Sequence, residues 1–209
     1  DYNAPVAFYW PEFGAHGKDR VTVAEALSHQ AGVCGFKDEI DPHLWLDWEG
    51  LCAHLAAQTP LWEPGTQHGY HPHTYGFIAG EILRRVTGYK VGEKLRAIAD
   101  GGGLWPRAVE VYSGLGAEMF NDRAAVMRKP SAPPYIGAVS DIKKAAFLAP
   151  WSYARGDTMV AMAAADIPAS NMYATAAGLA EFMVPLSLKS AQNGFGSLTE
   201  RTKKAMCNV

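Results

Sequence analysis

A tight turn, a short polar loop and a strongly patterned helix follow one another between residues 63 and 88, and this stretch constrains the fold more than any other. Pro64 and Gly65 stand at the second and third positions of a four-residue turn, which suits type II geometry because glycine takes positive φ at little cost. Beyond the loop, apolar residues recur at three- and four-residue steps, and this spacing predicts a helix with one buried face. The apolar positions are Phe77, Ile78, Ile82, Leu83 and Val86.

The opposite side of the same helix is expected to carry Glu81, Arg84 and Arg85. The helix should end at Gly88, because glycine is the usual residue just after a helix C-terminus. Tyr70 then lies on a short loop at the mouth of a rigid helix. Catalytic side chains are often held on loops that a scaffold positions, so this loop is the first candidate for a functional site.

Three histidines share the loop with Tyr70, and imidazoles two or three residues apart can converge on a metal ion. No carboxylate or cysteine accompanies them locally, and Pro72 stiffens the loop. We therefore expect no metal site here. The three are His68, His71 and His73.

The size and charge of the chain narrow the classes of function. With 209 residues, 48% of them hydrophobic, residues 1–209 can bury a substantial core as a single domain. A net charge of −2 and no basic block argue against a nucleic-acid or anionic-membrane partner. No run approaches the roughly 18 uninterrupted apolar residues of a membrane span. The chain starts at Asp1 without a methionine or a signal peptide, which predicts a segment of a longer protein. Nothing in the sequence specifies an oligomeric state or a compartment.

The three cysteines are too few and too scattered for a disulfide framework or a CxxC metal site, and we expect them to be small apolar core residues. They are Cys34, Cys52 and Cys207.

The remaining patterns predict a mostly helical chain. Thr22 and Glu25 form a capping box that begins a helix running to about residue 30, and His29 at its end would favour the helix dipole. The first twenty residues are predicted to form an extended, packed connection. Residues 129–137 form a proline-rich loop, expected to be a lid or a domain edge. Further helices are predicted over 46–58, 91–99, 174–184 and 198–206, with a break at 101–103 and a strand over 109–113.

Four segments occur in an order and spacing that is similar to the serine β-lactamase-like superfamily, which comprises class C β-lactamases, DD-peptidases and esterases of the same fold. The resemblance is greatest to the esterase-like branch, where T-V-x-x-L-L-S-H-x-A-G and Y-H-x-x-T-Y-G segments are typical. It covers roughly residues 5–100, and residues 165–180 resemble the loop and helix that follow in those esterases. The four segments are Trp10–Gly14, Val21–Gly32, Trp62–Thr66 and Gly69–Gly76.

The resemblance implies an α+β fold of the β-lactamase/DD-peptidase type. Residues 1–209 would form part of a single β-lactamase-related domain, mainly its helical portion. Most of the antiparallel sheet is expected in two ends that lie outside this sequence.

The resemblance also implies a serine hydrolase that forms an acyl-enzyme on an ester or amide and needs no cofactor. Family members use a serine and a lysine in S-x-x-K, a tyrosine from a Y-x-N-like motif and a late K/H-x-G strand. A serine hydroxyl is a weak nucleophile, so a neighbouring base must take its proton. A phenol of ordinary pKa, about 10, is a poor base unless a lysine ammonium close by favours the phenolate. Tyr70 matches the family tyrosine, whereas Pro72 stands where many members have Asn.

Two of the three family motifs are absent from this sequence. No S-x-x-K precedes Tyr70, and no K/H-x-G follows the helix predicted over 174–184. One S-x-x-K occurs at Ser140–Lys143, but it follows Tyr70, against the family order. We expect Ser140 to be a helix N-cap with Asp141 in the first turn.

Three further residues are candidates for substrate binding. His71 follows the esterase pattern, for which the resemblance implies a positional role. Trp62, ahead of the turn, either walls the substrate cleft or packs in the core. Tyr135, in the proline-rich loop, could line the same cleft.

These observations lead to one hypothesis and one alternative. The hypothesis is a carboxylesterase of the β-lactamase-like kind, acting on small acyl esters when complete, with Tyr70 catalytic. Residues 1–209 alone are predicted to be inactive. The alternative is a catalytically degenerate member of the family that serves as a structural or interaction module.

Overall fold

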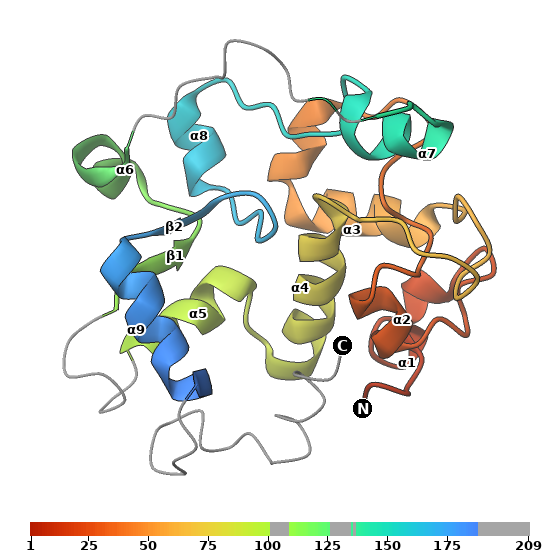
Figure 1. Ribbon diagram of the computed structural model, residues 1–209, viewed down its shortest axis with the longest axis horizontal. Helices are drawn as coiled ribbons and strands as arrows, with labels where there is room; N and C mark the ends of the chain where they lie inside the picture. Colours follow the sequence, from red (N-terminus) through yellow and green to blue (C-terminus); the bar gives the residue numbers. More distant parts are fainter. Residues whose placement is uncertain (101–108, 126–134, 136, 188–209) are drawn as a thin grey trace.

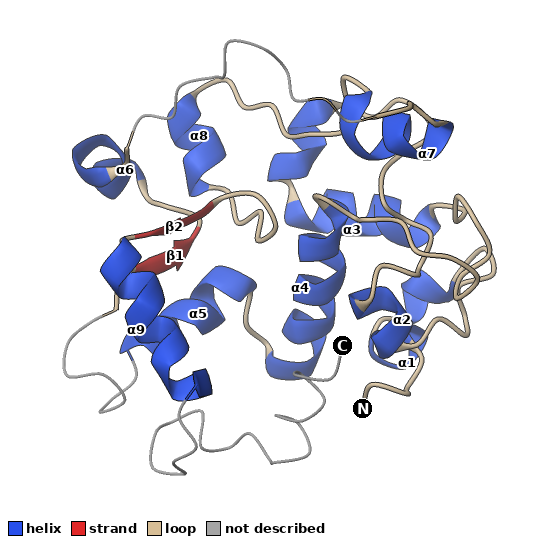
Figure 2. Ribbon diagram, viewed as in Figure 1, coloured by secondary structure: helices blue, strands red, loops and turns tan. Residues whose placement is uncertain are grey.

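The computed structural model describes residues 1–100, 109–125, 135 and 137–187, and within them the fold is mostly helical with a small antiparallel sheet (Figures 1 and 2). The predicted helical character is therefore confirmed. No helix in this part of the chain is both long and apolar enough to cross a membrane. The elements are α1 (Val6–Tyr9), η1 (Pro11–Gly14), α2 (Val23–Leu27), η2 (Pro42–Leu46), α3 (Trp48–Ala57), α4 (Thr74–Thr87), α5 (Val91–Asp100), β1 (Val111–Ser113), α6 (Ala117–Arg123), α7 (Asp141–Lys143), η3 (Lys144–Leu148), α8 (Met159–Ala164), β2 (Met172–Ala174) and α9 (Ala176–Ser187).

Helix α4 lies at the centre of the molecule, with α1, α2, α3 and α5 packed around it (Figure 1). Phe77 and Ile78 are fully buried on its inner face, as the apolar spacing predicts. The helix ends at Gly88, which adopts φ 79° as a left-handed cap and donates its N–H to the Arg84 carbonyl. The predicted C-terminal end of this helix is confirmed.

The prediction that Glu81 lies on the side of α4 opposite the buried stripe is wrong. Glu81 is only 1% exposed, whereas Val86, predicted to be buried, is 59% exposed. The Trp48 indole N–H donates to the Glu81 carboxylate at 2.9 Å, and the guanidiniums of Arg84 and Arg85 donate to it at 2.7–2.8 Å. Burial alone would raise the pKa of Glu81, but these hydrogen bonds outweigh burial and lower the pKa to about 2. A carboxylate with this many donors can be buried, which a pattern of apolar residues does not reveal.

The first twenty residues are not extended, so that prediction is wrong. They form the single turn α1 and the 3₁₀ turn η1, and Val6, Trp10 and Phe13 within them are buried in the main core. Pro11 occupies the first position of η1, where a missing N–H costs nothing and the fixed φ of proline suits a helical turn. The packing of this segment was predicted correctly and its backbone was not.

The capping box of α2 is present as predicted. The Thr22 hydroxyl accepts from the Glu25 N–H at 3.1 Å, and the Glu25 carboxylate accepts from the Thr22 N–H at 2.8 Å. These bonds satisfy two free amides at the helix start. The short helix then delivers residues 28–33 to the loop that carries Tyr70.

A second, smaller core lies beside the two-stranded sheet on the left of Figure 1. Strand β1 pairs with β2 in antiparallel register, with Val111 opposite Ala174. The predicted strand over 109–113 and helices over 46–58, 91–99 and 174–184 are confirmed, with shifted ends. The break at 101–103, the helix over 198–206 and most of the loop over 129–137 lie outside the described residues. The pattern did not reveal α6, α8 or β2.

Two of the three cysteines are buried and free, as expected of core residues. Burial raises the pKa of the Cys34 thiol to about 11 and raises that of Cys52 further. Cys207 lies outside the described residues.

Candidate functional site

The turn at residues 63–66 sets the course of the loop that carries Tyr70. The Thr66 N–H donates to the Glu63 carbonyl at 3.2 Å, and Gly65 has φ 79° at the third position, as predicted. A side chain at Gly65 would be strained at this φ, and its Cβ would lie 2.8 Å from a Glu25 carboxylate oxygen. The turn therefore abuts the same glutamate that caps α2.

Residues 28–33, the backbone segment that follows α2, form a template on which the loop rests. Backbone carbonyls and amides of this segment bond to several residues of 61–71, some thirty to forty positions further along the chain. Because the loop is anchored at several points along its length, its backbone is fixed well beyond what its own sequence dictates. The bonds run from Leu61 N–H to Gly32 O at 2.7 Å, Gly65 N–H to Gln30 O at 3.1 Å, Gly69 N–H to His29 O at 3.1 Å, and Val33 N–H to His71 Nε2 at 3.3 Å.

His71 is the buried anchor of the loop, with 1% of its surface exposed. Its Nε2 accepts from the Val33 N–H, so its Nδ1 carries the proton and donates to the Gly69 carbonyl at 2.5 Å. Burial, followed by the nearby His29, lowers the pKa of His71 to about 4, although the bond to Gly69 opposes this. The ring is thus neutral near pH 7. Its burial fits the positional role, while contact between His71 and substrate stays a prediction.

Trp62 lies beneath the loop and supports it. The indole is buried, its ring packs edge-on against His71 at 5.9 Å, and a Cβ on Gly69 would come within 2.3 Å of Trp62 Cη2. Its Nε1–H is buried and has no hydrogen-bond partner among the described residues. The structure places Trp62 in a packing position. The alternative, that Trp62 walls a substrate cleft, stays a prediction.

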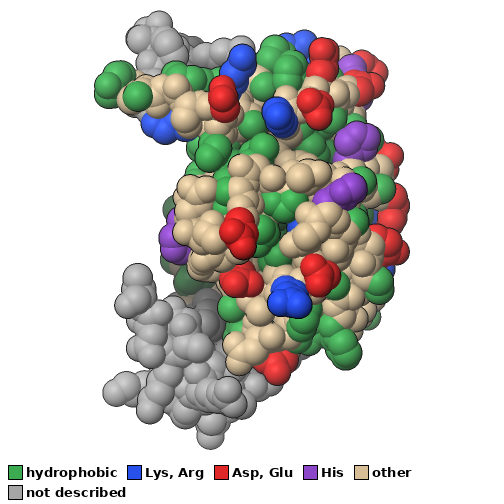
Figure 3. All heavy atoms as spheres, turned by 90° about the vertical axis from the view of Figure 1, so that its right-hand side faces the viewer, with side chains coloured by type: hydrophobic (Ala, Val, Ile, Leu, Met, Phe, Trp, Pro, Cys, Tyr) green, Lys and Arg blue, Asp and Glu red, His purple; other side chains and the backbone are tan. Residues whose placement is uncertain are grey.

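Tyr70 points away from this buried layer and is 62% exposed. Its ring packs edge-on against His29 at 5.1 Å and stacks on Phe147 of η3 at 6.0 Å. Its hydroxyl forms no hydrogen bond with any residue that the structure describes. Figure 3 turns toward the viewer the side of the molecule where this loop lies, and shows histidine side chains exposed there among hydrophobic and acidic ones. The aromatic ring of Tyr70 is therefore held by packing against His29 and Phe147, whereas its hydroxyl has no hydrogen-bond partner among the described residues.

The three loop histidines do not converge on one point. The Nδ1 atom of His68 lies 3.2 Å from the Ser28 carbonyl oxygen, and the Nδ1 of His73 bonds to the Ser170 hydroxyl. His71 is engaged with Val33 and Gly69, as described above. Within residues 1–100, 109–125 and 137–187, no group of three or more His, Cys, Asp or Glu side chains is arranged to hold a metal ion.

Tyr135 and Ser140 lie apart from this arrangement. Tyr135 is 95% exposed, and no ring contact or hydrogen bond joins it to Tyr70 in the described part of the chain. Its role in substrate binding stays a prediction. The Ser140 hydroxyl accepts from the Lys143 N–H at 3.2 Å at the start of α7, with Asp141 in the first turn, so the predicted N-cap is confirmed.

Two residues that the sequence analysis did not place beside Tyr70 pack against its ring, namely His29 and Phe147. His29 was assigned to the helix dipole, but α2 ends at Leu27 and His29 follows it with φ 65°. Burial, and then the nearby His68, lowers its pKa. The helix is shorter than the predicted end at about residue 30, while the dipole explanation for His29 stays a prediction. The sequence showed the 21–32 and 69–76 segments in the order typical of the family, but this order did not predict that the two segments contact each other.

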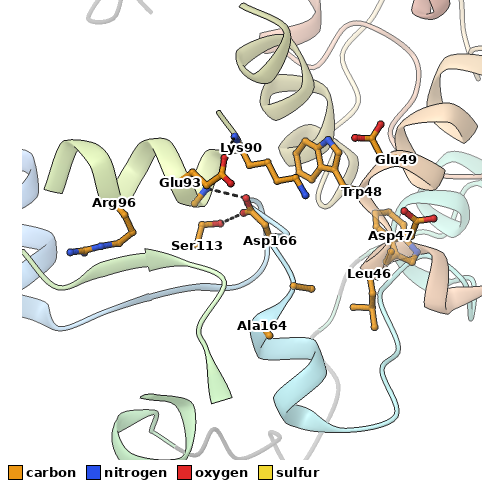
Figure 4. Close-up of a pocket in the computed structure, with 13 residues that line it drawn as sticks. Leu46, Asp47, Trp48, Glu49, Lys90, Glu93, Arg96, Ser113, Ala164 and Asp166 are labelled. Carbon is orange, nitrogen blue, oxygen red and sulfur yellow. Dashed lines mark hydrogen bonds between the residues drawn. The ribbon is translucent and has the colours of Figure 1, made fainter. Parts of the chain in front are cut away.

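Two hollows in the surface offer alternative sites, and Tyr70 lines neither of them. One, of about 720 Å³, lies between the start of α3, helix α5 and the end of α8 (Figure 4). In it the Asp166 carboxylate accepts from the Gly92 N–H at 2.9 Å and from the Ser113 hydroxyl at 2.5 Å. The two carboxylate oxygens of Asp166 therefore link α5 to β1. The other hollow, of about 990 Å³, lies between residues 36–40 and 141–151.

Comparison with known proteins shows which families and structures the chain is similar to. The sequence profile of the beta-lactamase family matches residues 1–206. The esterase/beta-lactamase LipL of Mycobacterium tuberculosis is 42% identical over 88 residues, which are 42% of this chain and 20% of LipL.

Solved structures agree. A penicillin-binding protein homologue from Caulobacter crescentus is 44% identical with a TM-score of 0.81, over 89% of this chain and 48% of that protein. A family VIII carboxylesterase is 38% identical with a TM-score of 0.73, over 90% and 48%. EstA from Arthrobacter nitroguajacolicus is 32% identical with a TM-score of 0.68, over 87% and 48%. The chain thus spans about half the length of these three structures.

Proposed function

Since the chain belongs to the beta-lactamase family and has the corresponding fold, we propose that the complete gene product is a serine carboxylesterase in which Tyr70 acts as the general base. Two similar proteins, LipL and the family VIII carboxylesterase, are named for esterase activity. The favoured substrates are small acyl esters, with β-lactam or peptide hydrolysis secondary. The proposal includes an acyl-enzyme intermediate.

The observation that carries this proposal is the presentation of the Tyr70 hydroxyl. The N–H groups of Gly69 and His71, on either side of Tyr70, are both hydrogen-bonded to His29, and the phenol of Tyr70 is exposed to a reactant. A general base must lie within hydrogen-bond reach of the proton that it removes, and its position must not drift. An exposed phenol on an anchored loop supports the second requirement, and its accessible oxygen leaves room for a nucleophile to approach.

The proposed reaction follows from this arrangement. The serine Oγ attacks the carbonyl carbon of the ester while its proton passes to the Tyr70 oxygen. The alcohol leaves with that proton as the bond between the acyl carbon and the alcohol oxygen breaks. Water then attacks the acyl-enzyme while Tyr70 takes its proton, and the bond to the serine Oγ breaks as Tyr70 returns the proton to Oγ and the carboxylic acid is released. Ser140 is committed to its helix cap, so the proposal requires a nucleophile from a part of the complete protein other than residues 1–209. A lysine ammonium beside the phenol is required as well, to favour the phenolate.

The ester preference rests on position 72. Pro72 offers no side-chain amide where many members of the family have one to orient a substrate amide, and it is buried beside His71. An ester substrate has no amide N–H for such a side chain to orient, so its hydrolysis does not need one. We expect p-nitrophenyl acetate or butyrate to be hydrolysed faster than nitrocefin.

A fluorophosphonate probe tests the proposal directly. Intact mass of the complete gene product should rise by one probe adduct, and Tyr70→Phe should slow both adduct formation and ester hydrolysis by about 100-fold or more. Tyr89→Phe is the matched control, because Tyr89 is also exposed but lies after the far end of α4, and it should react like wild type. A folded wild-type protein without an adduct would instead support the degenerate module. Equal rates for Tyr70→Phe and Tyr89→Phe would remove Tyr70 from the mechanism.

A further inference from the structure

One residue holds the peptides on both sides of Tyr70. The His29 carbonyl accepts the Gly69 N–H at 3.1 Å, and the His29 Nδ1 accepts the His71 N–H at 3.2 Å. The Cα of Tyr70 lies between these two anchored amides. A shift of His29 therefore moves Tyr70 directly, although the two residues are 41 positions apart.

The backbone of His29 is in an uncommon conformation that makes this double contact possible. Its φ of 65° lies in the left-handed region, which non-glycine residues seldom adopt. The ring then packs against Tyr70 at 5.1 Å and against Tyr75 at 4.8 Å. Strained backbone of this kind persists where the surroundings fix it, and it is concentrated at functional sites.

We infer that His29 is a positioning residue for Tyr70 and that it holds the loop only as a neutral imidazole. A peptide N–H can only donate, so Nδ1 must keep its lone pair to accept from His71. Protonation would place two donors against each other and break the bond. The inference rests on the proposed function in so far as Tyr70 is the group to be positioned.

The surroundings of His29, above all its burial, favour the neutral imidazole. The titratable groups that face it are His68, His71, Tyr70 and Tyr75. Among them His71 is itself neutral near pH 7, because burial lowers its pKa to about 4. Burial and then His68 lower the pKa of His29. The bond to His71 is therefore complete near pH 7 and is lost as the pH falls through the pKa of His29.

Two substitutions of His29 distinguish the role of its hydrogen-bond acceptor from that of its titrating imidazole. In His29→Asn, the side-chain oxygen can occupy the position of Nδ1, and asparagine tolerates positive φ. In His29→Ala the acceptor is gone. With p-nitrophenyl butyrate and the complete gene product, we expect kcat to fall roughly 10- to 100-fold in His29→Ala, with KM changed by less than about threefold. His29→Asn should recover most of kcat and should no longer lose activity on the acid side where wild type does.

His16 provides a matched control. It is also a histidine with positive φ, at 56°, but it is exposed and lies in the turn after η1. His16→Ala and His16→Asn should leave kcat and its pH profile unchanged. If His29→Ala retains wild-type kcat, or if His29→Asn is no better than His29→Ala, the inference is overturned.

Amide hydrogen exchange tests the same contact without any enzyme activity. At pH 7 the His71 amide should exchange about fivefold faster in His29→Ala, the effect of losing one net hydrogen bond, and be protected again in His29→Asn. The Gly69 amide, which bonds to the backbone carbonyl of His29, should change less. If wild type hydrolyses no ester but the exchange pattern holds, the proposed function fails and the contact stands. Unchanged exchange at His71 would refute the contact itself.

Discussion

Replacing Glu81 by glutamine tests whether the buried ion cluster of α4 stabilises the fold. The carboxylate is 1% exposed and accepts from Trp48, Arg84 and Arg85. Its pKa is lowered from 4.5 to about 2. At about 1.4 kcal/mol for each pKa unit, this difference corresponds to about 3 kcal/mol of folding free energy at pH 7. That value matches the cost of removing one partner from a buried ion pair, about 3–5 kcal/mol.

The sign of the pH dependence follows from the same shift. A carboxyl group whose pKa is lowered in the folded state contributes all of its stability above the unfolded pKa, and loses it as the pH falls toward the folded value. The difference between wild type and Glu81→Gln should therefore be largest above pH 5. It should shrink to about 1.4 kcal/mol at pH 3.

Urea denaturation followed by circular dichroism measures both quantities. Glu49→Gln is the matched control, because Glu49 pairs with the same Arg84 at 3.7 Å but is exposed, so its loss should cost less than about 1 kcal/mol. The reasoning would be refuted if the two variants were equally stable at pH 7. It would also be refuted if the deficit of Glu81→Gln stayed constant between pH 7 and pH 3.

Three other expectations are simpler to check. Gly69→Ala would bring a methyl group within 2.3 Å of Trp62, so it should lower the stability by about 1–3 kcal/mol in a thermal melt and lower kcat as well. A wild-type melting temperature would contradict the packing described. Ser140→Ala should cost about 1 kcal/mol of stability and keep ester hydrolysis, since the hydroxyl caps Lys143; loss of all activity would make it the nucleophile. Cys34 should resist iodoacetamide at pH 8 until the protein unfolds, because burial raises the pKa of its thiol to about 11; peptide mapping that finds it labelled in the native protein would disprove this.

The parts of the fold that the sequence predicts are those with local causes. The capping box of α2 needs only Thr22 and Glu25, and the left-handed cap of α4 needs only Gly88. Both are confirmed, as is the positive φ of Gly65. Propensity and spacing over a few residues are enough in such cases, because the interacting groups are close along the chain.

The parts that failed have causes far along the chain. Glu81 is buried because Trp48, 33 positions away, donates to it, and no periodicity within α4 carries that information. His29 and Tyr70 meet for the same kind of reason. The left-handed conformation of His29 was not predicted either, because positive φ is uncommon even for histidine and its identity alone does not specify it. The resemblance identified Tyr70, and the structure supplied the residues that hold it.

The template at residues 28–33 has a consequence for attempts to exchange parts between relatives. The conformation of the loop from Leu61 to His71 depends on hydrogen bonds to residues 28–33, so the two segments have to be transferred together. A chimaera that grafts only the tyrosine loop onto a related scaffold would separate donors from their acceptors. Grafts that carry both segments together should keep the geometry, and the boundary for recombination therefore falls before α2 and after the first turn of α4.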